Sequence, residues 1–176
     1  MKTDLITFGH ECADIGMGKR EARRVSESAL VATHLMMPQD ANIRGNVYGG
    51  TIMKLMDEIA GSVAALHCRT VAVTASIDHM SFHEPVYIGN LLILKAAVNY
   101  VGKTSLEIGV RIEARDLKTG AVTHTGSSYL TFVALDDRGH PALVPGIIPE
   151  TADEKRRYTE AKQRRAQRLV SAHDIG

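Results

Sequence analysis

Cysteine is scarce in this chain of 176 residues, and no long apolar run is present. The two cysteines, Cys12 and Cys68, cannot form a disulfide framework, and neither lies in a CxxC pair. No apolar run approaches the ~20 residues that a membrane-spanning helix needs. The first residues, MKTDLITFGHECADIG, lack an apolar core of signal-peptide length. We therefore expect a protein of the reducing cytoplasm that is not inserted in a membrane.

An excess of charge of one sign is also missing. The chain has 21 lysine and arginine residues against 20 aspartate and glutamate residues, which gives a formal net charge of +1. This balance gives no reason to expect nucleic acid as the main ligand. The length fits one domain with a substantial core. We expect an N-terminal arm over 1–27, frayed or helical, a central domain over 28–148, and a basic C-terminal helix or tail over 149–176.

Hydrophobic periodicity predicts the order of elements in the central domain. A first strand is expected at Ala29–Met37, and a turn-rich loop then leads to a helix from about Gly50 to His67. After this helix the apolar period changes from 3.6 to 2, which predicts antiparallel strands joined by tight turns. The expected strands are Val71–Phe82, Leu91–Val101, Ser105–Arg115 and Ala121–Leu135.

The C-terminal segment has a different character. Its prolines, in PALVPGIIPE, favour an extended crossing segment, and TADEKRRYTEAKQRRAQRLV then predicts a terminal helix. Thr151 and Glu154 have the spacing of a capping box. Because few apolar residues punctuate this helix, we expect it on the outside of the core.

The stretch GNVYGGTIMKLMDEIAG places glycines before an apolar helix that carries a carboxylate in its middle. At 100° per residue, one broad face of that helix is apolar; its residues are Ile52, Leu55, Met56, Ile59, Val63 and Leu66. Met53, Ala60 and Ala64 extend this face, and Asp57 lies on the seam beside them. A helix that is apolar over most of its circumference is normally wrapped by other elements.

The glycines and the carboxylate suggest a chemical function. The first N–H groups of a helix have no internal partner, and Gly49 and Gly50 allow another molecule to approach that backbone closely. Such groups can stabilise an oxyanion, and Asp57, about two turns further, is a candidate base or nucleophile. From the residues alone, a structural role for Asp57 stays open, through a bond to the backbone or to Lys54. The glycines match neither a P-loop nor a GxGxxG motif.

Three stretches together resemble a known family. They are DANIRGNVYGGTIMKLMDEIAGSVAALHC, VTASIDHMSFHEPV and GKTSLEI, and the similarity extends over about residues 31–168. The chain resembles the acyl-CoA thioesterases of the hotdog fold, especially the cytosolic acyl-CoA hydrolase group, which includes a brain-type enzyme with two tandem hotdog domains. The resemblance implies an α+β hotdog fold, in which a curved antiparallel sheet wraps a long central helix and a C-terminal helix lies on the surface.

The resemblance also implies roles for particular residues. Asp57, within KLMDE, matches the family's catalytic aspartate, and Asn42, within DANIRGN, matches its active-site asparagine. Because both motifs stand in one short chain, it implies a homodimer with two sites, each taking Asn42 from one subunit and Asp57 from the other. Similar proteins form hexamers of three dimers. The residues alone leave open that Asn42 is only a turn residue.

A further motif is GKTS. The resemblance suggests that Lys103, Thr104 and Ser105 help to hold the CoA moiety through its phosphates or pantetheine. An ordinary hairpin turn with a solvated lysine remains the alternative. For the basic tail, we favour a solvated helix face or a subunit contact over attraction of CoA phosphates; its residues are Lys155, Arg156, Arg157, Lys162, Arg164, Arg165 and Arg168.

Other polar groups receive structural interpretations. His79 and His83 share one face of a strand, but no carboxylate or cysteine arrangement completes a metal site, so none is expected. His67 and Cys68 point about 100° apart on a helix, which disfavours a nucleophilic dyad. Cysteine at such a position is usually a buried filler.

Asp78 and Glu84 are interpreted as turn or strand-surface charges, and a position of Glu84 near the cleft stays open.

The function expected from these observations is hydrolysis of acyl-CoA to free fatty acid and CoA. No metal or redox cofactor is expected, and CoA enters only as part of the substrate. One alternative is a hotdog dehydratase or hydratase, which generally uses a histidine that is missing here from the glycine loop and the mid-helix position. The other is a non-catalytic protein that binds acyl-CoA for regulation.

Overall fold

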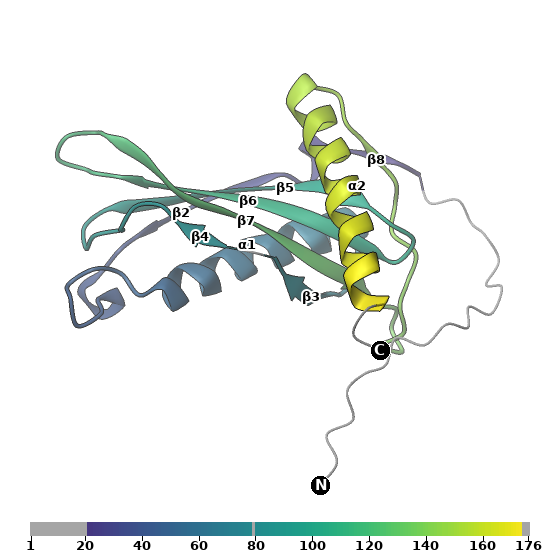
Figure 1. The fold of residues 1–176 in the computed structure, drawn as a ribbon, viewed down its shortest axis with the longest axis horizontal. Helices are drawn as coiled ribbons and strands as arrows, with labels where there is room; N and C mark the ends of the chain where they lie inside the picture. Colours follow the sequence, from purple (N-terminus) through teal and green to yellow (C-terminus); the bar gives the residue numbers. More distant parts are fainter. Residues whose placement is uncertain (1–20, 79, 174–176) are drawn as a thin grey trace, which may run out of the picture.

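One antiparallel sheet forms the framework of the protein. The computed structural model describes residues 21–78 and 80–173. The strand order is β2-β5-β6-β7-β3, and β4 also pairs with β7 (Figure 1). The strands are β2 (Leu30–Leu35), β3 (Ala72–Ile77), β4 (Ser81–Phe82), β5 (Leu91–Val101), β6 (Ser105–Arg115) and β7 (Val122–Ala134). The predicted bounds of β5 and β6 are confirmed, whereas the predicted strand Val71–Phe82 is divided into β3 and β4.

The helix α1 (Gly49–Cys68) lies along one face of this sheet and contacts β2, β3, β5, β6 and β7 (Figure 1). Its buried residues are Ile52, Met56, Ile59, Ala60, Val63, Ala64, His67 and Cys68. They pack on alternate residues of the strands, such as Leu106, Ile108 and Ile112 of β6. Each such side chain contributes about 1.5–3 kcal/mol when it is fully buried. The α+β hotdog fold predicted for the chain is confirmed.

Part of the predicted apolar face of α1 is not covered within the chain. Leu66 is 49% exposed and Met53 is 42% exposed, although both were placed on or beside the buried face. The helical angle gives the apolar side of a helix, but it does not tell how far neighbouring strands extend over that side. Cys68 is buried, as expected for a filler.

The strand β3 contains a β-bulge. Thr74 pairs with Phe132 of β7 and Ser76 pairs with Thr131, so Ala75 is the extra residue. One extra residue reverses the alternation of side chains along a strand. Thr74 therefore faces α1 together with the buried Phe132, whereas Ser76 faces the opposite side of the sheet.

The helix α2 (Ala152–His173) crosses the outer face of the sheet, on the side opposite to α1 (Figure 1). Its predicted capping box is confirmed, because Thr151 Oγ1 accepts from the N–H of Glu154, and Glu154 Oε2 accepts from the N–H of Thr151. On the sheet side, Arg164 donates to Glu107 of β6 at 2.6 and 3.3 Å. The Glu107 side chain is only 1% exposed, so α2 seals a buried carboxylate.

The remaining described segments attach the chain ends to the core. Residues 21–27 of the predicted arm form β1 (Arg23–Arg24) and a 3-10 turn (Val25–Glu27), and β1 pairs with β8 (Ile147–Ile148). Arg23 donates to the carbonyl of His67 at the end of α1. Val25 is buried and β1 is paired, so residues 23–27 are attached to the core although most of them are exposed. Residues 1–20 of the arm lie outside the described residues, and the domain boundaries at 28, 148 and 149 stay predictions.

The buried His67 generates a prediction about pH. Its Nδ1 lies 3.4 Å from the Ser28 hydroxyl and its Nε2 lies 3.1 Å from the Pro145 carbonyl. Burial lowers the pKa of His67 below its ordinary value of 6.5, although the bond to Pro145 opposes this. Below pH 6.5 the unfolded chain binds a proton that the folded chain does not, so the free energy of unfolding falls as the pH decreases towards the lowered pKa. The limiting slope is about 1.4 kcal/mol per pH unit.

Urea unfolding on both sides of pH 6.5 measures this slope. His67→Gln keeps a donor for Pro145 and should remove the contribution, whereas His34→Gln, on the exposed part of β2, should retain it. An unchanged slope in His67→Gln would contradict the assignment.

The buried Glu107 carboxylate, which α2 covers, leads to a second prediction, about stability. Arg164→Met keeps the apolar stem of the side chain but leaves Glu107 with fewer charged donors. The free energy of unfolding should fall by about 1–3 kcal/mol, because hydrogen bonds to a buried charged group are strong. Arg156→Met is the matched control, since the partners of Arg156 among the described residues are Asp153 and Glu160, on the surface of the same helix. Equal stability of the two variants in urea unfolding would show that the network with Glu107 contributes nothing.

Candidate active site

Asp57 is half-buried on the flank of α1 that faces β3. Its Oδ1 accepts a hydrogen bond of 2.7 Å from Thr74 Oγ1. Lys54 pairs instead with Glu58, at 3.6 Å, so the ion pair with Lys54 considered from the sequence is not formed. Within the described residues, Asp57 Oδ2 has no hydrogen-bond partner. The hydrogen bond from Thr74 therefore fixes the orientation of the carboxylate.

Thr74 is a site residue that sequence reasoning missed. It lies 17 positions after Asp57, in a strand whose alternation offered no local sign that its hydroxyl faces the helix. The bulge at Ala75 sets that direction. The only signal in the sequence is a hydroxyl residue in the strand that follows the helix.

Asn42 stands in the loop before α1. Its backbone carbonyl accepts from the N–H of Gly45 at 2.9 Å, and its side-chain Oδ1 accepts from the N–H of Arg44 at 2.8 Å. Gly45 has a φ of +81°, in the left-handed region that favours glycine. Asn42 is thus a turn residue, as predicted by the alternative left open from the sequence. Its amide group also remains available, since within the described part of the chain it donates to no group.

Gly49 and Gly50 form the first turn of α1. Tyr48 precedes them and makes no side-chain cap, and its carbonyl accepts from Thr51 and Ile52. A Cβ at Gly50 would meet nothing within 4 Å, and one at Gly49 would lie 3.3 Å from the Phe82 ring. The open backbone at Gly50, at the positive end of the helix dipole, suits contact with a developing negative charge.

The predicted site residues lie at different places along α1. Asn42 and the glycines are at its N-terminal end, and Asp57 lies eight residues beyond Gly49, or about 12 Å along the axis. No hydrogen bond joins Asn42 to Asp57 in the described chain. A single chain therefore holds the parts of the site but does not bring them together.

The GKTS turn joins β5 to β6 at the end of the sheet where α1 finishes. The carbonyls of Lys103 and Thr104 accept from the N–H groups of Val144 and Ala134, both at 3.0 Å. Ser105 Oγ accepts from Arg165 of α2 at 3.0 Å. The Lys103 side chain is exposed. The hairpin interpretation is confirmed for the backbone, and contact with CoA stays a prediction.

The structure also gives the surroundings of the histidines and acidic residues that the sequence offered as further candidates. His79 lies outside the described residues, and among those that are described no three histidine, cysteine or acidic side chains gather as a metal site. The two ring nitrogens of His67 are bonded to Ser28 and Pro145. Glu84 is exposed, as expected. Asp78, directly after β3, is paired with Arg168 and its side chain is 20% exposed, a pairing that the sequence did not predict.

The basic tail differs in part from expectation. Arg164, Arg165 and Arg168 contact the chain's own sheet rather than forming a solvated face, whereas Lys155 and Lys162 are exposed. Arg156 is exposed and bonds within α2. No helix in the described ranges has the length and apolar character needed to cross a bilayer.

The edge of the sheet at β3 is apolar and uncovered. Val71, Val73, Ile77 and Phe82 are 64%, 43%, 46% and 44% exposed. An edge strand presents unpaired backbone groups, and a contiguous apolar patch usually marks an interaction surface. Thr74 belongs to this same strand and is exposed. The carboxylate of Asp57 and its donor are therefore adjacent to a surface suited to another protein chain.

A long helix against an antiparallel sheet, with a carboxylate facing the edge strand, defines a hotdog-fold protein. A family model described as the thioesterase superfamily matches residues 44–121. The chain is 39% identical to an acyl-CoA hydrolase from Staphylococcus aureus, covering 88% of this chain and 96% of that one, with a TM-score of 0.79. The chain belongs to this thioesterase superfamily.

Two other comparisons define how far the similarity extends. A hexameric acyl-CoA thioesterase has a TM-score of 0.84 and 38% identity, covering 86% of this chain and 97% of that one. The cytosolic acyl coenzyme A thioester hydrolase of Rattus norvegicus is 39% identical over 146 residues, or 82% of this chain. The chain spans only 38% of the length of that relative.

The Staphylococcus aureus hydrolase has been solved with butyryl coenzyme A, coenzyme A and coenzyme A disulfide. It has also been solved as three variants in which an asparagine, an aspartate or a threonine is replaced by alanine. In that protein the aspartate follows the asparagine by 15 positions, and the threonine follows the aspartate by 17.

Proposed function

We propose that this chain is an acyl-CoA thioesterase that hydrolyses fatty acyl-CoA to a free fatty acid and CoA. The observation that carries the proposal is the Asp57 carboxylate, held by Thr74 at 2.7 Å beside the apolar β3 edge. Asn42, Asp57 and Thr74 are separated by 15 and 17 positions, the same spacings as the three residues replaced in the Staphylococcus aureus hydrolase.

In the proposed reaction, Asp57 acts as general base or as nucleophile. As a base, Asp57 Oδ2 takes a proton from water while the water oxygen attacks the thioester carbonyl carbon. As a nucleophile, the same oxygen attacks the carbon and water then hydrolyses the anhydride. In both cases the carbonyl oxygen becomes an oxyanion, which the backbone N–H groups of Gly49 and Gly50 stabilise. The CoA thiolate leaves and takes up a proton.

Asn42 has a positioning role in this scheme. Its Oδ1 is held by the N–H of Arg44, so the amide N–H groups are directed by the loop. They donate to the thioester carbonyl or orient the attacking water. Lys103, Thr104 and Ser105 contact the CoA moiety, with the exposed Lys103 ammonium facing its phosphates. No metal or redox cofactor takes part in the scheme.

The active form is proposed to be a homodimer, since one chain separates Asn42 from Asp57. The uncovered β3 edge supports edge-to-edge pairing, which covers the exposed apolar side chains and brings Asp57 of one chain to the glycine loop of the other. A hexamer of three dimers is proposed by analogy with the hexameric thioesterase of similar fold. A cytoplasmic location remains a prediction, in line with the name of the cytosolic relative.

Replacement of Asp57 tests the proposed chemistry. Asp57→Asn keeps an acceptor for Thr74 but removes the base, and Asp57→Ala removes both. Each should lower kcat for thiol release from acyl-CoA by about 100- to 10,000-fold, the usual contribution of a positioned acid or base. Glu58→Gln, on the neighbouring exposed position, is the control. Full hydrolysis by Asp57→Ala would overturn the mechanism, and binding of acyl-CoA without turnover by the natural chain would favour the regulatory alternative.

Mixing two inactive variants tests the shared site. Asn42→Ala and Asp57→Ala chains are unfolded together and refolded as a mixture. In a mixed dimer, one site contains both substitutions and the other contains none. Roughly a quarter of the wild-type activity should therefore return in a statistical mixture, because the two subunits are equivalent. If each site is built from one chain, every site carries a substitution and no activity returns.

A further inference from the structure

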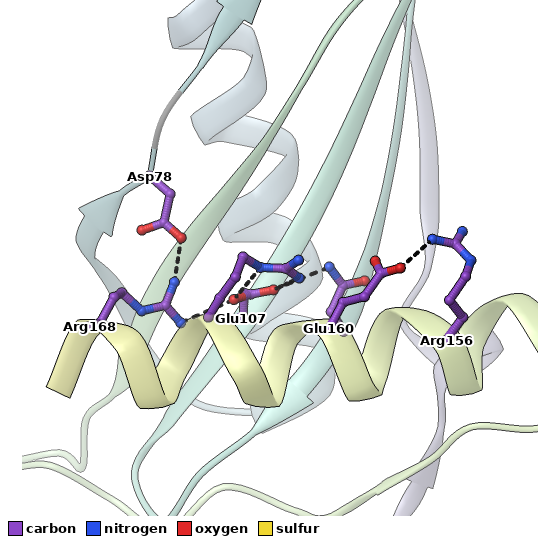
Figure 2. Close-up of polar contacts among 7 residues, drawn as sticks. Asp78, Glu107, Arg156, Glu160 and Arg168 are labelled. Atoms are coloured by element: carbon purple, nitrogen blue, oxygen red, sulfur yellow. Dashed lines mark hydrogen bonds and ion pairs between the residues drawn. The ribbon is translucent and has the colours of Figure 1, made fainter. Parts of the chain in front are cut away.

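Two arginines of α2, Arg164 and Arg168, bind the outer face of the sheet, and Arg168 reaches the end of β3. Arg168 donates to Asp78, which directly follows β3, and to Glu107 Oε2 at 3.0 Å (Figure 2). Arg164 bonds to the same Glu107, and its guanidinium lies 3.6 Å from the centroid of the Tyr129 ring. The Tyr129 carbonyl in turn accepts from the N–H of Asp78 at 2.9 Å. The last residues of β3 are thus held from the outer face of the sheet.

The bulge at Ala75 makes this arrangement possible. In a regular strand, residues four apart point to the same face, so Thr74 and Asp78 would both face α1. The extra residue reverses the alternation, so that Thr74 faces α1 and Asp57 while Asp78 faces α2. The strand β3 and the residue that follows it therefore contact Asp57 on the inner face of the sheet and Arg168 on the outer face.

Within the described residues, β3 is held by its pairing with β7 and by its contacts with α1. It is an edge strand, with β7 as its one paired neighbour in the described part of the chain, and most of its side chains are exposed. Its bulge interrupts the ladder to β7 between Thr74 and Ser76. The Arg168 contact with Asp78 holds the strand beyond this interruption. A shift of the strand there would change the direction of the Thr74 hydroxyl.

We infer that Arg168 is a positioning residue for hydrolysis, acting through Asp78 and β3 on the Thr74–Asp57 hydrogen bond. This inference rests on the proposed function. Arg168 does not touch the reacting atoms, because α2 and Asp57 lie on opposite faces of the sheet. Its guanidinium bridges two carboxylates from different strands, which fixes the end of β3 relative to β6. A lysine, as a single point charge, cannot hold both in one planar geometry.

Arg168 can be replaced without leaving the buried Glu107 unpaired. Arg164 still bonds to Glu107 at 2.6 Å, and Asn99 Nδ2 lies 3.4 Å from its Oε1. The Arg168 and Asp78 side chains are 30% and 20% exposed, so water can reach Asp78. The substitution is therefore expected to move β3 while the fold is retained.

Steady-state kinetics of thiol release from acyl-CoA test the inference in four variants. Arg168→Gln should lower kcat by about 10-fold or more with KM little changed, since a misplaced catalytic group can cost up to about 100-fold. Arg168→Lys should recover part of this loss. Asp78→Asn, which changes the other partner of the Arg168–Asp78 contact, should lower kcat by a similar factor. Arg156→Gln, on the same helix and paired with Asp153 and Glu160 on its surface, should behave as the natural chain.

A double-mutant cycle separates positioning from general destabilisation. If Arg168 acts through Thr74, then Arg168→Gln should have little further effect on kcat in a Thr74→Ala background. A merely structural role predicts the same fold-loss in both backgrounds, and that result would overturn the inference. Equal kcat values for Arg168→Gln and Arg156→Gln would overturn it as well. Absence of hydrolysis by the natural chain would instead contradict the proposed function.

Discussion

The burial of α1 against the sheet is the constraint on which the other features depend. Its apolar residues cover so much of its circumference that the helix is stable only against a broad surface, and five strands supply that surface. Asp57 sits where this cover ends, at β3. Because burial of an unpaired carboxylate is costly, the sheet must provide a donor there, and Thr74 does so. The same packing that builds the core therefore leaves a half-buried carboxylate at its margin.

The strand β3 has three functions in this architecture. It closes the sheet over α1, it presents an apolar edge suited to a second chain, and it carries the donor to Asp57. These functions require side chains on both faces, and the bulge at Ala75 supplies the change of direction. The helix α2 then fixes the end of the strand from outside. A terminal basic helix, which from its composition would be solvated, thus becomes part of the support of the proposed site.

Several features followed from the sequence because they depend on local patterns. The bounds of β5 and β6 were predicted from alternation and flanking turns, and the capping box of α2 from two residues three positions apart. The single strand predicted over Val71–Phe82 was wrong, since the break and the bulge arise from pairing with β7. Thr74 and the Asp78–Arg168 pair were not predicted, because their partners lie 17 and 90 positions away.

The sequence by itself determined the α+β order of elements, the apolar character of α1 and the presence of Asp57 at its flank, because residue spacing sets which side chains share a face. The resemblance to the family, also carried by the sequence, proposed the roles of Asp57 and Asn42. Only the tertiary structure decided what Asp57 meets, which face each residue of β3 serves, and where the arginines of α2 bind. These contacts join segments distant in the chain, and their geometry depends on packing that no local pattern contains.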